Sequence, residues 1–228
     1  MHSKNPDVIR MANTIKRTPN AIAIRLGNYA FVDESLPQKG LENGYRQVSP
    51  IWQEFLHDRD TLIFESERIL AEKENQQIES KYKNDLLDVQ NLVGETKVRA
   101  IKIRVNQHIF RQMVLVNYGN RCAITGINIS SLLIASHIVP WSENEKERLN
   151  PENGICLSPL YDRAFDQGLI GITPDLELRV SEKLNAFSKE PFHQKHFASI
   201  HGQKIREAEK YRPRRDFLEW HWEKFFVS

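Results

Sequence analysis

The sequence predicts an α+β protein in two parts: a small, mainly helical amino-terminal domain at residues 1–94 and a carboxy-terminal domain at residues 95–228. Two observations predict this organisation. In the first part, apolar residues recur at the spacing of three and four that marks one face of a helix. In the second part, residues 121–172 read as strand, loop, strand and helix, a mixed order that is typical of an α+β domain.

The composition is that of an ordinary globular protein, with 40% hydrophobic and 27% charged residues in a chain of 228. No apolar run approaches the roughly 18 residues that a membrane helix needs. The stretch His2-Ser-Lys-Asn-Pro6 has no apolar core and does not resemble a signal peptide. We therefore expect a cytoplasmic protein, in which Cys122 and Cys156, the only cysteines, stay reduced.

Residues 6–29 predict two short helices separated by a break. Thr18 is suited to cap the second helix, and Pro19 to occupy its first position. Helix, short turn and helix is also the shape of a helix-turn-helix reader, in which Asn20 and Arg25 would face DNA. An ordinary helical hairpin is the alternative, since two short helices are common in any protein.

The rest of the first part predicts a loop, a short helix and a connector. Turn-forming residues punctuate residues 33–50, and residues 50–58 carry apolar side chains at helical spacing. Residues 60–90 predict one longer charged helix, whose mostly polar second half suits a solvent-exposed connector. We place the domain boundary at residues 91–96, around a glycine.

A basic segment follows the boundary. Residues 95–135 hold six Lys or Arg against one acidic residue, whereas the preceding part holds 12 against 14. Residues 97–105 alternate between apolar and polar and could form a strand, and residues 107–118 predict a helix. Such a charge concentration suits a polyanion, with Arg104 and Arg121 as candidate contacts, although it could also be a solvated face.

The chemically informative residues cluster around the predicted strand pair. His137 ends the first strand, Asn153 precedes the second, and Asp162 and Asp166 share one face of the following helix. A neutral imidazole can take a proton from water near neutral pH. Carboxylate oxygens can hold a hard cation that stabilises a phosphorane, and an asparagine can hold the loop that aims the histidine. The constellation therefore predicts metal-assisted hydrolysis of a phosphodiester.

These motifs resemble the HNH, or ββα-metal, endonuclease family, and in particular its bacterial restriction endonuclease branch. The matching residues are Cys122-Ala-Ile-Thr-Gly126, Ala135-Ser-His137-Ile-Val-Pro-Trp141, Asn150-Pro-Glu-Asn153-Gly-Ile155 and Asp162-Arg-Ala-Phe-Asp166. The resemblance covers about residues 97–226 and implies a ββα-metal core with flanking helices. Several fixed spacings occur together, which makes the match specific.

By this resemblance, His137 takes the position of the general base, Asn153 that of the middle asparagine, and Asp162 that of a metal ligand. Asp166, one turn later, is like the second helix ligand of some relatives. The implied cofactor is a divalent ion, Mg²⁺ above all, with Mn²⁺ as an alternative. Ser136 departs from the family pattern, because most members carry an aspartate or histidine ligand there.

Many relatives also hold a structural zinc ion with two pairs of cysteines. The corresponding positions here are Cys122, Thr125, Ser158 and Tyr161. One cysteine cannot hold zinc in the four-ligand geometry that the ion requires, so we predict no structural zinc.

The sequence predicts DNA as the partner, cleaved in restriction or another defence. Four arginines are candidate contacts to it: Arg25, Arg104, Arg121 and Arg163. Arg163 could instead form a surface ion pair. Two other functions stay open: a DNA-binding module with a weakened site, which Ser136 favours, and a nuclease of RNA. Cutting both strands with one site per chain would suggest a homodimer.

Overall fold

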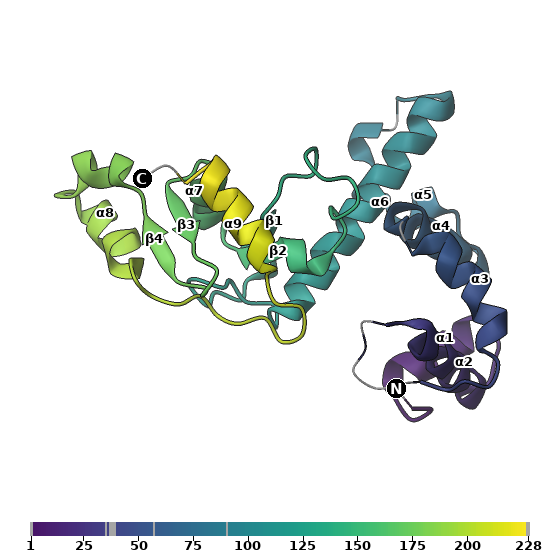
Figure 1. Ribbon diagram of the computed structural model, residues 1–228. Helices are drawn as coiled ribbons and strands as arrows, with labels where there is room; N and C mark the ends of the chain where they lie inside the picture. The colour runs from purple at the N-terminus through teal and green to yellow at the C-terminus, as the bar shows by residue number, and fades with distance from the viewer. Residues whose placement is uncertain (1, 35, 37–39, 57, 90, 227–228) are drawn as a thin grey trace. The chain divides into compact units, whose positions relative to one another are not determined.

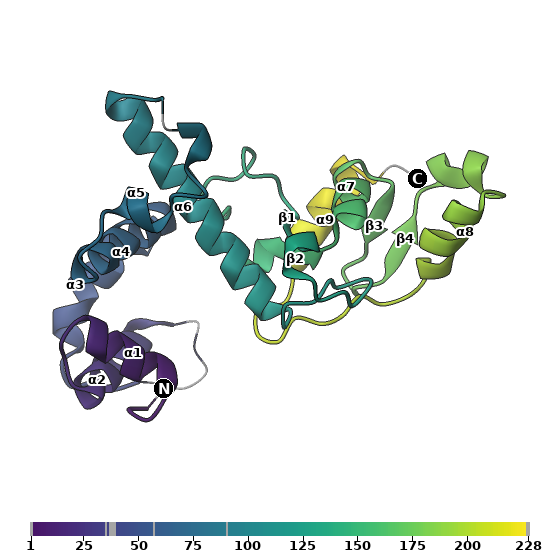
Figure 2. The same ribbon diagram turned by 180° about the vertical axis from the view of Figure 1, so that it is seen from behind.

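The computed structural model divides into two compact units, Met1–Asn106 and Gln107–Ser228 (Figures 1 and 2). The structure describes residues 2–34, 36, 40–56, 58–89 and 91–226. The amino-terminal part is helical, and the carboxy-terminal part combines small β-hairpins with helices. The predicted α+β class and the order of its two parts are thereby confirmed.

Three helices open the amino-terminal unit: α1 (Pro6–Thr14), α2 (Pro19–Val32) and α3 (Tyr45–Phe55). The predicted cap of α2 is present, because the Thr18 hydroxyl accepts a hydrogen bond of 3.2 Å from the Ala21 N–H. Helix α2 packs against both α1 and α3. The two predicted short helices are therefore confirmed.

The single long helix predicted for residues 60–90 is wrong. The structure has α4 (Arg59–Lys73), then α5 (Ile78–Lys81) and a short 3₁₀ turn. Helix α4 stops because Asn75 adopts a left-handed conformation with φ of 56°, and the Gln76 N–H reaches back to the Ala71 carbonyl. Asparagine tolerates this conformation and commonly ends helices.

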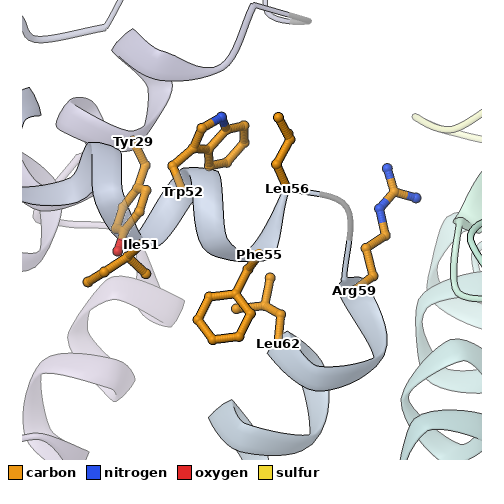
Figure 3. Close-up of a pocket in the computed structure, with 7 residues that line it drawn as sticks. All are labelled: Tyr29, Ile51, Trp52, Phe55, Leu56, Arg59 and Leu62. Carbon is orange, nitrogen blue, oxygen red and sulfur yellow. The ribbon is translucent and has the colours of Figure 1, made fainter.

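Helices α2, α3 and α4 leave an apolar pocket of about 340 Å³ between them (Figure 3). The rings of Tyr29 and Trp52 lie beside each other at a centroid distance of 6.4 Å. The pocket is lined by Tyr29, Ile51, Trp52, Phe55, Leu56, Arg59 and Leu62. The amino-terminal unit thus has an open apolar surface as well as a buried core.

The strand suggested for residues 97–105 is also wrong, because these residues belong to the long helix α6 (Gly94–Asn117). Ile101 and Val105, one turn apart, are both buried, which is the pattern of a helix face. The division between the two units falls inside α6. In the part of the chain that the structure describes, no helix is both long and apolar enough to cross a membrane.

The carboxy-terminal unit is built on a ββα arrangement. Strands β1 (Ile134–His137) and β2 (Gly154–Leu157) pair antiparallel, with His137 opposite Gly154, and α7 (Pro159–Asp166) follows directly. A side chain at residue 154 would place its Cβ 2.3 Å from a methyl group of Val114 on α6. Glycine at this position therefore lets the hairpin lie against α6.

A second hairpin and two helices complete this unit. Strands β3 (Ile170–Ile172) and β4 (Leu178–Val180) pair antiparallel, and α8 (Pro191–His196) and α9 (Arg215–Lys224) follow. The core contains large side chains from several elements, among them Phe110, Phe165, Leu178 and Leu218. Strand β3 packs against α7 and α9, and Phe165 of α7 stacks on His221 of α9. The remaining 3₁₀ segments are Leu87–Val89, Ser130–Leu132, Pro151–Asn153, Glu182–Phe187 and Ala198–Ile200.

Candidate active site

His137 is held at the end of β1 in a single orientation. Its Nε2 donates a hydrogen bond of 2.9 Å to the carbonyl of Arg148. The ring stacks on Phe110 at 4.0 Å and meets Trp141 edge-on at 5.6 Å. Because a carbonyl oxygen can only accept, the proton of the neutral ring lies on Nε2 and the lone pair on Nδ1. Burial lowers the pKa of His137, which favours this neutral form, and the Arg148 hydrogen bond partly opposes the shift.

Asn153 fastens the two ends of the segment that joins β1 and β2. Its side chain is fully buried. Its Oδ1 accepts a hydrogen bond of 2.8 Å from the Val139 N–H, and its Nδ2 donates to the Val139 carbonyl at 3.0 Å. A longer bond of 3.4 Å reaches the Glu147 carbonyl. These contacts suit the predicted role of holding the loop that aims the histidine.

Asp162 and Asp166 lie one turn apart on α7, the first half-buried and the second exposed. Burial raises the pKa of Asp162, and the Ser136 hydroxyl and the Arg163 charge oppose this shift. The pKa of Asp166 is also raised, first by partial loss of hydration and then by the negative charge of Asp162, again against Arg163. The two carboxylates therefore repel each other in surroundings that disfavour their charge.

The donor set around Asp162 fits a divalent cation. The Ser136 hydroxyl is buried and lacks any partner with ordinary hydrogen-bond geometry in the described chain, although it lies near the Asp162 carboxylate. Hard oxygen donors of this kind suit Mg²⁺ or Mn²⁺, which often takes only one or two carboxylates and completes its shell with water and phosphate. Within the described residues, no three His, Cys, Asp or Glu side chains gather into a metal-binding group. An ion here would therefore depend on Asp162, Asp166 and oxygens from water and substrate.

Hydrogen bonds join the two turns that carry zinc ligands in many HNH proteins. The buried Cys122 Sγ accepts hydrogen bonds from the Ser158 N–H at 3.2 Å and the Thr125 N–H at 3.4 Å. The Tyr161 hydroxyl donates to the His196 carbonyl at 2.8 Å. The Cys122 thiol thus connects the two turns, and Tyr161 connects the second turn to α8.

The four predicted nucleic-acid contacts lie in both units. Arg121 and Arg163 belong to the carboxy-terminal unit, and Arg25 and Arg104 to the amino-terminal unit. Arg163 is exposed on α7 and forms no ion pair within 4.0 Å among the residues that the structure describes. Arg104 pairs with Asp88, so part of its charge is neutralised within the protein. Each unit therefore carries two of the four arginines.

Sequence reasoning missed a support for the loop that comes from near the carboxy-terminal end. Arg214 forms an ion pair of 3.2 Å with Glu147 in the loop, and one of 2.7 Å with Asp216. Its backbone N–H donates to the Glu152 carbonyl at 3.1 Å, and its guanidinium lies 3.8 Å over the Phe217 ring. Residues 211–216 contain three arginines, but nothing in their spacing indicated contact with the loop.

Residues 122–173 match the model of the HNH endonuclease family. This match suggests nuclease activity, with a nucleic acid as substrate and a divalent metal ion. A solved structure described as the modification-dependent TagI restriction endonuclease is similar to the chain, at 21% identity and a TM-score of 0.36. The match covers 51% of this chain and 37% of that chain, so only about a third of that protein has a counterpart here. No curated protein sequence matches the chain.

Proposed function

We propose that this chain is a metal-dependent endonuclease that hydrolyses phosphodiester bonds of DNA in restriction or another defence. The observation that carries the proposal is the environment of His137. The Arg148 carbonyl leaves Nδ1 as the basic nitrogen, and burial keeps the ring neutral. The same strand brings Ser136 beside Asp162, so base and candidate metal ligand come from adjoining elements.

In the proposed reaction, Nδ1 of His137 removes a proton from a water molecule as its oxygen attacks the phosphorus. The bond from phosphorus to the leaving sugar oxygen then breaks. The imidazolium that forms is stabilised by its Nε2–H bond to the Arg148 carbonyl, and its lowered pKa favours return of the proton to solvent. Asp162 and Asp166 would hold a divalent ion, which would supply positive charge to stabilise the phosphorane and the leaving oxygen.

A DNA-binding module with a weakened nuclease site is the second candidate. Ser136 favours it, because a hydroxyl is a poorer metal ligand than the aspartate or histidine usual in the family. The half-buried carboxylate of Asp162 and the oriented His137 favour an active enzyme instead. A metal-dependent cleavage assay separates the two.

The test is plasmid cleavage by the wild-type chain, His137→Ala and His201→Ala, each with Mg²⁺, Mn²⁺ or EDTA. His201 is an exposed histidine of the same unit and serves as the matched control. We expect cleavage by wild type and His201→Ala only with metal, and a loss of about 100-fold or more in His137→Ala, the scale of a general base. Equal cleavage by His137→Ala, or cleavage in EDTA, would exclude the proposed mechanism. Structured RNA in place of plasmid tests the substrate class.

A further inference from the structure

Helices α1 and α2 are joined by a turn with a defined geometry. They lie side by side and are separated by residues 15–18 alone (Figures 1 and 2). The Arg17 N–H bonds to the Ala12 carbonyl at 2.9 Å, and Lys16 adopts a left-handed conformation with φ of 53°. Thr18 then caps α2. A helix pair joined by three or four residues is the framework of a helix-turn-helix.

The amino-terminal half of α2 presents an open face. Four of its residues at positions i, i+1, i+4 and i+5 are exposed: Asn20, Ala21, Ile24 and Arg25. By contrast, the carboxy-terminal half is covered by residues 40–44. There the buried Asn28 side chain donates hydrogen bonds to the carbonyls of Leu41 and Asn43. Only the first turns of α2 are therefore available to a partner.

The charge of this helix pair is mostly positive. Residues 6–32 contain four basic residues, Arg10, Lys16, Arg17 and Arg25, and one acidic residue, Asp7, which forms an ion pair of 3.1 Å with Arg10. Lys16 and Arg17, both exposed, form no ion pair within 4.0 Å in the described part of the chain. The Arg25 guanidinium donates a hydrogen bond of 3.0 Å to Gln47, which orients it. A polyanion complements this surface.

The side chains on the open face match the chemistry of base edges in duplex DNA. Arginine pairs with guanine, asparagine with adenine, and small apolar groups contact the thymine methyl. A helix about 10–12 Å across fits the major groove, which is about 12 Å wide. We propose that α1 and α2 form a helix-turn-helix that reads duplex DNA with Asn20, Ala21, Ile24 and Arg25, while Lys16 and Arg17 contact phosphates.

This inference goes beyond cleavage, since it gives the nuclease a sequence preference that resides in the other unit. It shares with the proposed function only the choice of duplex DNA. Lys16 adds a structural argument, because glycine is the residue that suits its left-handed position. The lysine at this position places a positive charge at the turn between α1 and α2.

Binding is measured on the full chain carrying His137→Ala in EDTA, so that no DNA is cut. Selection from a randomised pool first identifies the preferred duplexes. Fluorescence anisotropy then measures how tightly these duplexes bind to Arg17→Ala, Arg25→Ala, Lys16→Gly and the control Lys73→Ala. Lys73 is an exposed lysine at the end of α4 in the same unit. We expect Arg25→Ala to weaken the preferred duplex roughly fivefold or more and to relax preference at one base pair.

The expected result for Arg17→Ala and Lys16→Gly is a similar loss on every duplex, with the salt dependence of log Kd reduced by about one per contact. Lys16→Gly should unfold at the same or a higher temperature, because glycine relieves the left-handed turn. Lys73→Ala should bind like its parent. Unchanged binding in Arg17→Ala, Arg25→Ala and Lys16→Gly would overturn the inference. Equal competition by duplex RNA, whose major groove excludes a helix, would also overturn it. Binding without cleavage by the wild-type chain would instead remove only the proposed nuclease activity.

Discussion

Burial of the His137 ring sets the pH range in which it can serve as a base. The charged ring loses hydration between Phe110 and Trp141, so its pKa lies below its usual value near 6.5. Since the neutral ring is the active form, activity should fall only as the pH drops through this lowered pKa. We predict that the acidic limb of the kcat/KM profile lies below about pH 6.5.

The profile of Phe110→Ala provides the comparison. Removing the stacked ring admits water, which should move the acidic limb back toward the ordinary histidine value. A wild-type limb at or above that value, unmoved by Phe110→Ala, would contradict the assignment of His137 as a buried base.

The aspartates of α7 should destabilise the metal-free protein. The folded-state pKa values of Asp162 and Asp166 are raised, so each carboxyl favours folding in its protonated form, and that stability is lost as the pH rises through the folded pKa. At pH 7 in EDTA, Asp162→Asn should therefore unfold at a higher temperature than wild type. The difference should narrow as the pH is lowered toward about 4, near the pKa of a free carboxyl.

Addition of Mg²⁺ or Mn²⁺ completes this test. A bound ion should raise the unfolding temperature of wild type by mass action, and Asp162→Asn should lose most of that rise. Both temperatures come from one thermal scan with and without metal. A lower unfolding temperature for Asp162→Asn in EDTA would show that the carboxylate already has a stabilising partner within the protein.

The candidate site was predictable at the level of single residues because its members are local in sequence. The three elements that carry the candidate residues follow one another in the chain: the strand with His137, the turn with Asn153 and the helix with Asp162. Their short separation in sequence therefore predicted that these elements lie close together. Phe110 and Arg214 come from distant elements, and no spacing links them to the loop. Their contact depends on tertiary packing, which local patterns do not encode.

Among the elements, the segment between β1 and β2 depends most on outside support. Arg214 bonds to Glu147 there, whereas Arg212, two residues earlier, forms only an exposed pair with Glu207. We predict that Arg214→Ala lowers kcat about tenfold or more, because the Arg148 carbonyl in that segment positions His137, and lowers stability by about 1–2 kcal/mol. Arg212→Ala should change stability by less than about 0.5 kcal/mol.

Steady-state kinetics and denaturant unfolding measure the two effects separately. Arg214→Lys keeps the charge but loses the bidentate contact of the guanidinium with Asp216, and its activity should fall between wild type and Arg214→Ala. Equal effects of Arg212→Ala and Arg214→Ala would show that the segment holds His137 without this contact.

Element prediction failed where β-branched residues occur in a helix. Residues 97–105 alternate like a strand, yet Ile101 and Val105 lie one turn apart on one buried face of α6, and Phe110 and Val114 form a second buried pair further along the helix. Burial at steps of four within each pair decided the structure, and it outweighed the local preference of valine and isoleucine for strands. The break after α4 was missed for another reason, because the left-handed Asn75 was read as part of a polar helix face.

At the scale of the whole molecule, the sequence predicted a helical part followed by an α+β part. The two compact units divide the chain at a different residue. The predicted boundary at residues 91–96 lies at the start of α6, whereas contacts divide the chain within that helix. Lys102 and Asn106 bond to Thr61 and Asp60 of the amino-terminal unit, while Phe110 packs on His137. A continuous helix that serves two cores has no boundary signal in its sequence, since its helical pattern is unbroken.

The number of active sites per chain determines how a duplex is cut. The proposed site has one base, His137, and one pair of carboxylates, Asp162 and Asp166, so a single copy should cut one strand in each encounter. We predict that plasmid is nicked first, and that linear product rises with a higher power of protein concentration than nicked product does. Cleavage over a concentration series, resolved on agarose gels, measures both orders.

Mixing with the inactive His137→Ala chain shows whether two copies act together. If a homodimer makes the double-strand cut, the yield of linear product should fall roughly as the square of the fraction of active chains. The yield of nicked product should fall only in proportion to that fraction. Asp33→Asn, in the other unit, keeps the nuclease residues intact and serves as the diluent control. Equal suppression of both products, with first-order formation of linear DNA, would mean that one chain cuts both strands in turn.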